Sequence, residues 1–436
     1  MLLLLLGCAT DIQDPSQTVG DIGTVVTVRW WSPLAATGQV QLTAAAGTYT
    51  LPATRVASEG GYAYAAPLLG LTSDETAEAE IQLLDGDAVV ATTPLSVHAG
   101  RLDMVLPNAS LDDSLGLPEG LLLTSFAEDP AAAVILNEAG KPVWAVLGTE
   151  GTNISESRLH PDGGQIIFGE YLAALDDAPD RIVRVGLSGS PYTSQAAPGL
   201  HHGLDVLPDG TVAYIAYDAR EVDGELIQGD RIMELSEDGT LVEVWSAWDA
   251  LSYTANTPSS GSGWTHANAL NYAADEDAYY LSLHNYNAIL MIDRATGETR
   301  WTLGGPEDDF DLSKSATFRR QHQFQVLNDN ILIFDNGSMS EGYTEVHELT
   351  LDTAAMTATP VWNYQPAESL YTLVLGDVQR LNDGDTLITY CGSGIVEQVS
   401  PQAEVRWRLY TPLSAVLGYS THLSEPADFF RPAEQR

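Results

Sequence analysis

The sequence predicts an all-β protein, in which a small immunoglobulin-like or fibronectin-like β-sandwich precedes a six-bladed β-propeller. Two observations predict this fold. Short alternating runs of apolar and polar residues, separated by Gly, Pro, Asp and Ser, occupy residues 9–100. Over residues 101–436 a longer unit recurs, made of several short strands, one of which carries Trp. No long stretch has the apolar period of a helix.

The first module is predicted from five short runs between residues 21 and 97. The runs are TVVTVRWW, GQVQLTAA, GYAYAAPLL, AEIQLLDG and AVVATTPLSV. Their spacing is that of a small antiparallel sandwich with one buried face per sheet. No group of residues in this module suggests chemistry.

The propeller is predicted from the repeat that follows. Clear copies are AAVILNEAGKPVWAVLG from Ala132, RIMELSEDGTLVEVWSA from Arg231, AILMIDRATGETRWTLGG from Ala288, TEVHELTLDTAAMTATPVWNY from Thr344 and GIVEQVSPQAEVRWRLY from Gly394. Units of about 40 to 60 residues that supply four strands each are typical of propeller blades. The remaining ~335 residues fit six blades of that length.

The charge of the chain excludes some partners. Nineteen Lys and Arg residues face sixty Asp and Glu residues, which gives a formal net charge of -41 over 436 residues. A field of this sign repels nucleic acid and anionic membrane surfaces. We interpret the acidity as a source of solubility, and an anionic substrate would need a local cation.

The N-terminus, MLLLLLGCAT, carries the L-x-G-C pattern of a bacterial lipoprotein cleavage site at Cys8. The basic residues that open a signal peptide are missing, so either the true start lies upstream or the match is accidental. We interpret residues 1–8 as a truncated lipoprotein signal segment. The mature protein would then be exported to the periplasm or cell surface and held on the membrane only by lipid on Cys8. Cys391, the other cysteine, is expected in the core.

Three histidines recur at one position of the repeat. The segments are HGLDVLPDGTVAYIAY from His202, HANALNYAADEDAYYLSL from His266 and HQFQVLNDNILIFDNG from His322, and each has an apolar residue four positions after the histidine. The first strand of every blade lines the channel of a propeller, so the three imidazoles are expected to converge at its entrance. His201 is an alternative to His202, because a shift of one residue reverses the face of a strand.

The same comparison shows that the blade itself does not require histidine, since Ile154 and Gly376 occupy equivalent positions. His284, in LSLHNYNAI, and Asn268, two residues after His266, are expected at the same site. Two chemistries fit such a set. Three histidines could bind zinc with one position open. Alternatively, one neutral imidazole could act as a nucleophile while the others donate hydrogen bonds to an oxyanion.

The motifs WTHANALNY, LSLHNYNAILMIDRATGETRWTLGG and QHQFQVLNDNILIFDNG resemble those of the bacterial PAPS-independent arylsulfate sulfotransferases, over about residues 100–425. The resemblance implies a six-bladed propeller that needs no cofactor. It implies transfer of a sulfuryl group from an aryl sulfate donor to a phenolic acceptor, through a transiently sulfated histidine.

The resemblance also assigns roles. It implies that His322 is the nucleophile. His266 and Asn268 would bind the sulfuryl oxygens, and His202 would do the same or protonate the departing phenolate. His284 stands where the family usually has arginine. Arginine is always charged, whereas histidine is largely neutral at pH 7, so the substrate would lose a permanent positive charge at this position.

Arg319 and Arg320 lie just upstream of His322 and could supply the charge of the missing arginine, but we expect them on a solvated loop. Two functions of other classes remain open alongside sulfuryl transfer. One is a surface-anchored propeller that binds a ligand without catalysis. The other is a metal-dependent hydrolase or lyase at the three-histidine rim.

Overall fold

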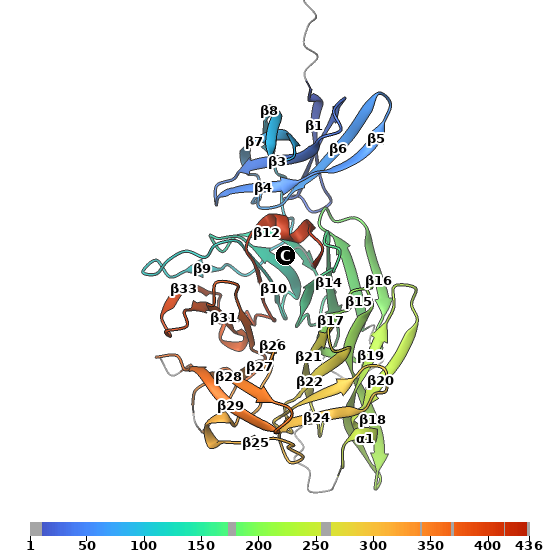
Figure 1. Ribbon diagram of the computed structural model, residues 1–436, viewed down its shortest axis with the longest axis vertical. Coiled ribbons are helices and arrows are strands. Elements are labelled where there is room, and N and C mark those ends of the chain that lie inside the picture. Colours follow the sequence, from blue (N-terminus) through green and yellow to red (C-terminus); the bar gives the residue numbers. More distant parts are fainter. Residues whose placement is uncertain are drawn as a thin grey trace, which may run out of the picture.

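The all-β prediction is confirmed by the computed structural model, which describes residues 11–172, 180–253, 263–340, 342–367, 370–413 and 415–433. Strands of these residues form eight sheets (Figure 1). The helical elements described are α1 (Ala247–Ala250), η1 (Lys314–Ala316), η2 (Cys391–Ser393) and η3 (Pro426–Phe430). No helix within the described ranges has the length and apolar character needed to cross a membrane. Cys8 lies outside these ranges, so its lipidation stays a prediction.

Two four-stranded sheets form the N-terminal sandwich, in the orders β1-β2-β6-β5 and β4-β3-β7-β8. Their strands are β1 (Gln13–Val19), β2 (Val26–Ser32), β3 (Thr37–Thr43), β4 (Thr48–Pro52), β5 (Thr54–Ser58), β6 (Gly61–Leu68), β7 (Thr76–Asp85) and β8 (Ala88–His98). Alternate residues of β2, among them Val28 and Trp30, are buried between the sheets. Trp30 stacks on Tyr64 with ring centroids 5.1 Å apart.

The other six sheets are the blades of the propeller (Figure 1). Blade 1 contains β10 (Leu121–Phe126), β11 (Ala132–Leu136), β12 (Pro142–Leu147) and β34 (Thr421–Leu423). Blade 2 contains β13 (Ser157–Leu159), β14 (Gln165–Glu170), β15 (Arg181–Gly186) and β16 (Tyr192–Ala196). Blade 3 contains β17 (Leu200–Val206), β18 (Val212–Val222), β19 (Glu225–Leu235) and β20 (Leu241–Ser246).

The remaining three blades hold most of the histidines of interest. Blade 4 contains β21 (Ala267–Ala273), β22 (Ala278–Leu283), β23 (Ala288–Asp293) and β24 (Thr299–Gly304). Blade 5 contains β26 (Phe324–Leu327), β27 (Asn330–Asp335), β28 (Glu345–Asp352), β29 (Thr357–Tyr364) and β25 (Asp311–Leu312). Blade 6 contains β30 (Asp377–Arg380), β31 (Thr386–Tyr390), β32 (Ile395–Val399), β33 (Val405–Tyr410) and β9 (Ser110–Leu111).

The ring is closed from both ends of the chain. β34, near the C-terminus, pairs with β10 and supplies the inner strand of blade 1. β9, at the start of the propeller, pairs with β33 and extends blade 6. The two closures protect edge strands of the first and last blades.

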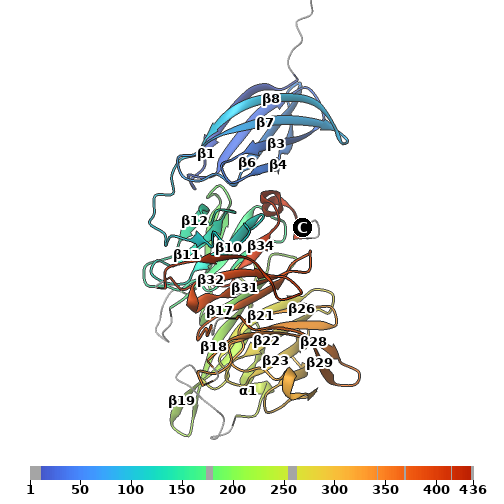
Figure 2. The ribbon, with the colours of Figure 1, turned by 90° about the vertical axis from the view of Figure 1, so that its left-hand side faces the viewer.

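The sandwich packs on the side of the propeller formed by blades 1 and 2 (Figure 2). Ile22, Val25 and Leu69 share one buried cluster with Trp144 of β12 and Phe168 of β14. The hydroxyl of Thr24 donates a 2.6 Å hydrogen bond to the carbonyl oxygen of Val143. The sandwich therefore rests on an apolar contact distant from the cavity described below.

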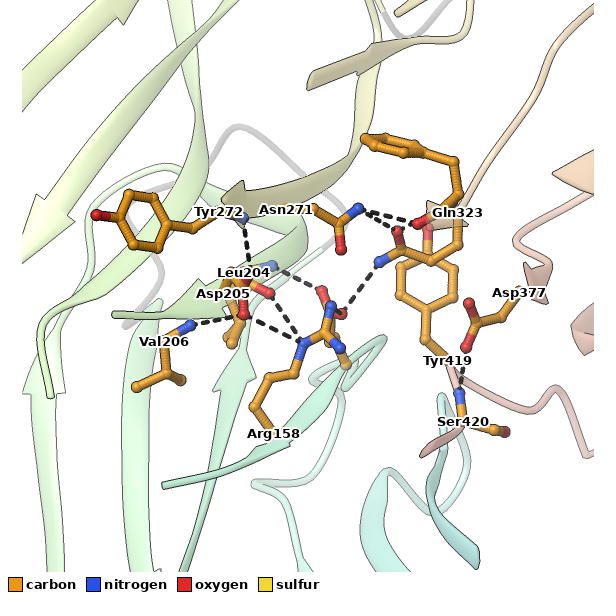
Figure 3. Close-up of polar contacts among 12 residues, drawn as sticks. Arg158, Leu204, Asp205, Val206, Asn271, Tyr272, Gln323, Asp377, Tyr419 and Ser420 are labelled. Carbon is orange, nitrogen blue, oxygen red and sulfur yellow. Dashed lines mark hydrogen bonds and ion pairs between the residues drawn. The ribbon is translucent and has the colours of Figure 1, made fainter. Parts of the chain in front are cut away.

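Buried polar side chains link the inner strands within the channel. The N–H of Leu204 donates to Glu156 at 2.8 Å, the N–H of Tyr272 to Asp205 at 2.8 Å, and the N–H of Ser420 to Asp377 at 2.7 Å. Figure 3 shows these contacts converging from several blades. Each bond joins one blade to another, so the network holds the inner strands in fixed relative positions.

Arg158 lies at the centre of this network. Its guanidinium is 2.5 Å from Glu156 and 3.7 Å from Asp205 (Figure 3). Burial raises the pKa of the Glu156 carboxyl, and the ion pair with Arg158 offsets part of that rise. The charges are satisfied within the channel, so they do not form an open substrate site.

Candidate active site

A cavity of about 400 Å³ opens at one end of the channel, and His202, His266, His284 and His322 all line it. His202 lies in β17, His266 directly precedes β21, and His322 stands two residues before β26. These are the inner strands of three consecutive blades, which is why a histidine at one position of the repeat recurs around the channel. His284 directly follows β22 of blade 4.

The four imidazoles form a row. Ring centroids are 4.9 Å apart for His202 and His266, 4.8 Å for His266 and His284, and 5.4 Å for His284 and His322. At these separations one small anion can contact several of the rings. The structure thus brings together four of the residues that the sequence suggested.

His202, rather than His201, lines the cavity. His201 lies behind it and is only 1% exposed. His202 and His266 have φ of 53° and 49°, in the left-handed region that side chains other than glycine rarely adopt. Such backbone strain is common where a side chain must be held toward a ligand.

Asn268 is not among the cavity residues, although the sequence suggested it. Its side chain is fully buried, and its amide nitrogen donates to the carbonyl oxygen of Gln321 at 2.8 Å. The register of β21 against β22 shifts between Ala267 and Ala269. This irregularity breaks the two-residue alternation on which the expectation rested. Asn268 therefore fixes the backbone that precedes His322.

His322 is held by two hydrogen bonds that identify its tautomer. Its Nδ1 lies 2.8 Å from Oδ1 of Asn336. The amide nitrogen of Asn336 donates to the carbonyl oxygens of Thr372 and Leu375, so its oxygen faces His322. Nδ1 must therefore carry the proton. The N–H of Leu375 donates to Nε2 at 3.1 Å, which places the lone pair of His322 on Nε2.

His284 has the same tautomer for a similar reason. Its Nδ1 lies 2.9 Å from Oδ1 of Asn285, whose amide nitrogen donates to the carbonyl oxygen of Gly263 at 2.7 Å. Nδ1 donates its proton, and Nε2 is left with a lone pair. A neutral His284 cannot donate a hydrogen bond from Nε2, whereas an arginine always can.

Burial keeps the histidines neutral. It lowers the pKa of His202 and of His322 well below the usual value, and it lowers the pKa of His266 to about 3. Burial also lowers the pKa of His284, and the positive charge of Arg320 adds to this effect. At neutral pH His322 is therefore an unprotonated imidazole, whose lone pair on Nε2 accepts a hydrogen bond from the N–H of Leu375.

Arg320 is the one lysine or arginine among the described residues that line the cavity. Sequence reasoning placed it on a solvated loop; its side chain is exposed, but it lies at the cavity beside His284. The two-residue alternation of an extended segment could not have placed it there, because Arg320 has a φ of 53°, in the left-handed region. Arg319 does not line this cavity.

Two further groups of cavity residues were missed. Tyr171 and Ser155 hydrogen bond to one another through their hydroxyl groups. Leu373, Val374 and Leu375, from the loop between β29 and β30, also line the cavity, and the N–H of Leu375 contacts His322. The repeat gave no signal for this loop because it lies outside the strands. Within the described part of the chain, no three His, Cys, Asp or Glu side chains are arranged to hold a metal ion.

The fold and this cavity define a β-propeller with a cavity lined by four imidazoles at one end of its channel. The family model described as Arylsulfotransferase (ASST) matches residues 111–411. The chain belongs to this family. No curated protein matches the sequence significantly.

Several solved structures are similar at low identity. A streptogramin B lyase shares 12% identity with a TM-score of 0.42, covering 73% of this chain and 96% of that chain. A catalytically inactive virginiamycin B lyase from Staphylococcus aureus with quinupristin shares 14%, with a TM-score of 0.41 and coverages of 72% and 87%. A putative 6-phosphogluconolactonase from Bacteroides fragilis shares 9%, with a TM-score of 0.43 and coverages of 70% and 98%. Similarity at this level supports no argument about function.

Proposed function

We propose that this protein transfers a sulfuryl group from an aryl sulfate to a phenolic acceptor through a sulfohistidine at His322. The observation that carries the proposal is the tautomer of His322. Asn336 holds the proton on Nδ1, so the lone pair of a neutral imidazole is on Nε2 at the cavity. A neutral imidazole is a good nucleophile, and membership of the arylsulfotransferase family supplies the substrate class.

The reaction divides into two halves. In the first, Nε2 of His322 forms a bond to sulfur, the bond from sulfur to the aryl oxygen breaks, and that oxygen takes a proton from the protein. The proton stays on Nδ1 of His322, and its hydrogen bond to Oδ1 of Asn336 stabilises the positive ring of the sulfohistidine. In the second half a phenol loses its proton and its oxygen attacks sulfur, which releases His322. Two such halves predict ping-pong kinetics.

Arg320 and His266 are the proposed contacts of the sulfuryl oxygens. The resemblance implies that His284 replaces the family arginine. In the neutral state Nε2 of His284 carries a lone pair and cannot donate a hydrogen bond. Arg320 therefore supplies the permanent positive charge. Asn268 is left out because its amide is buried against Gln321. Leu373 and Val374, which also line the cavity, offer an aliphatic surface for the aryl ring.

The test is intact mass after brief incubation with 4-nitrophenyl sulfate, followed by assay of nitrophenol release with phenol as acceptor. We expect one sulfuryl group on His322, and neither label nor turnover in His322→Ala. His98→Ala, in exposed β8 of the sandwich, is the matched control and should react as the wild type does. Undiminished turnover by His322→Ala would contradict the proposal.

We also propose that the protein is exported and anchored by lipid at Cys8, on the basis of the L-x-G-C pattern. Lipid at one terminus leaves the propeller free to meet phenolic compounds outside the cytoplasm. Expression of the protein from its native gene should place it in the membrane fraction. Cys8→Ser should move it to the soluble fraction, and an unchanged distribution would reject the anchor.

A further inference from the structure

A second histidine and a carboxylate lie directly behind His202. Nδ1 of His201 is 2.8 Å from Nδ1 of His202. On the other side, Nε2 of His201 is 3.0 Å from Oδ1 of Asp230, which is the distance of an ion pair, although the two atoms are not aligned for a hydrogen bond. His201 and Asp230 are each 1% exposed and do not line the cavity. The three residues form a line from a buried carboxylate to the cavity.

The positions of His201 and Asp230 are fixed by their surroundings. Oδ2 of Asp230 accepts a hydrogen bond from the hydroxyl of Thr265 at 2.5 Å and another from the N–H of Ala267 at 2.6 Å. Its other oxygen, Oδ1, is the one that faces His201. The ring of His201 stacks on Tyr217 with centroids 3.9 Å apart and planes 10° apart. His201 therefore cannot turn away from His202 without losing this packing.

The contact between the two imidazoles holds one proton. Two Nδ1 atoms at 2.8 Å must include one donor and one acceptor. The carboxylate of Asp230 favours a proton on Nε2 of His201. The shared proton then has two positions, on Nδ1 of His201 or on Nδ1 of His202. In the first position His201 is an imidazolium beside Asp230, and His202 is neutral with its proton on Nε2, toward the cavity.

We propose that Asp230 and His201 form a proton relay through which His202 protonates the departing aryl oxygen and deprotonates the acceptor phenol. The proposal rests on the proposed function. When Nε2 of His202 gives its proton to the aryl oxygen, the shared proton moves from Nδ1 of His201 to Nδ1 of His202. Both imidazoles are then neutral. The acceptor phenol returns one proton to Nε2 of His202, and the shared proton moves back to His201.

The relay places the positive charge on His201 rather than on His202. Burial and the neighbouring histidines lower the pKa of His202 well below its usual value, so His202 alone is a poor site for a positive charge. The relay leaves that charge on His201, beside the Asp230 carboxylate. A carboxylate that stabilises an imidazolium and fixes its tautomer has this role in hydrolytic triads. Here the imidazole of His201 lies between the Asp230 carboxylate and His202, which is the proposed general acid.

The test compares leaving groups in single turnovers. His201→Phe keeps the ring that stacks on Tyr217 but removes both nitrogens. Asp230→Asn keeps an oxygen to accept from Thr265 and Ala267. With 4-nitrophenyl sulfate, whose phenolate leaves without a proton, we expect sulfation of His322 within about threefold of the wild type. With phenyl sulfate we expect a loss of about 10²-fold or more in each variant.

The outcomes separate the two proposals. An equal loss with both donors would show that His201 and Asp230 act only on structure, and would overturn the relay. Absence of sulfation in the wild type with either donor would overturn the proposed function instead.

A second measurement covers variants that do not fold. In wild-type protein with ¹⁵N-labelled histidine, the shared proton should give a low-field ¹H resonance coupled to Nδ1. That resonance should disappear in His202→Gln, and its absence from the wild type would also overturn the relay. His98→Phe serves as the control for both measurements.

Discussion

The backbone N–H of Leu375 donates a hydrogen bond of 3.1 Å to Nε2 of His322. Nε2 is the atom that is proposed to attack sulfur, so its hydrogen bond with the N–H of Leu375 must break in each turnover. Leu375 has a φ of 53°, a conformation that costs a residue other than glycine on the order of 1 kcal/mol or more. The loop before β30 and the nucleophile are therefore coupled.

The tautomer of His322 depends on Asn336, which gives a first prediction. Asn336→Leu removes the acceptor of the Nδ1 proton, so both tautomers should become populated. We expect the rate of His322 sulfation to fall by about 10²-fold or more, as when a catalytic histidine loses its tautomer. Single-turnover kinetics measure the rate, and ¹⁵N shifts of the imidazole report the tautomer. A normal rate with mixed tautomers would refute the assignment of Nε2.

Asn336→Asp gives a contrasting result. The carboxylate still accepts from Nδ1 but now stabilises a protonated ring, so it should raise the pKa of His322. The lone pair would then be lost at neutral pH and recovered as pH rises. We expect the pH at which half of the sulfation rate is reached to move upward relative to the wild type. A pH profile that stays in place would contradict this.

Arg320 is predicted to bind the sulfate group of the donor. A hydrogen bond to a charged group contributes about 1.5 to 3 kcal/mol, so Arg320→Gln should raise the dissociation constant of an aryl sulfate by about 10- to 100-fold. Arg319→Gln is the matched control, because Arg319 is the next residue but does not line the cavity. Binding of 4-nitrophenyl sulfate to His322→Ala, measured by calorimetry, isolates affinity from turnover. Equal effects of the two variants would contradict the assignment.

Much of the architecture was predictable, because hydrophobic alternation and a Trp-bearing repeat determine strands and blades. The cavity was predictable in part, since His202, His266 and His322 recur in the repeat. Asn268 was expected on the cavity face, but its amide is buried against Gln321, because the register shift after Ala267 leaves no mark in the sequence. Leu375 could not be found at all, since its position depends on how a loop crosses the channel.

The resemblance to the family implies an arginine at the position of His284, and this predicts the effect of restoring the charge. His284→Arg should lower the KM for the donor, most at high pH, where histidine is neutral. In the absence of the donor the new charge would lie near Arg320, which already lowers the pKa of His284. The variant should therefore have a lower Tm without ligand and gain more Tm on adding 4-nitrophenyl sulfate. His284→Gln should show neither effect.

The buried imidazoles predict how stability depends on pH. The pKa values of His202 and His322 lie well below 6.5 in the folded protein and return to about 6.5 on unfolding. Below pH 6.5 the unfolded chain binds protons that the folded chain does not, so these histidines destabilise the fold progressively as pH falls.

The carboxyls of the channel act in the opposite direction. Burial raises the pKa of Asp377 to about 6 and also raises that of Glu156, so protonation at low pH stabilises the fold. The histidine effect is therefore isolated by comparing variants. Urea unfolding of the propeller at pH 7, 6 and 5 should show a shallower loss of stability in His322→Gln than in the wild type. His98→Gln, in the sandwich, should match the wild type, and equal slopes in all three proteins would show that His322 is not held neutral by the fold.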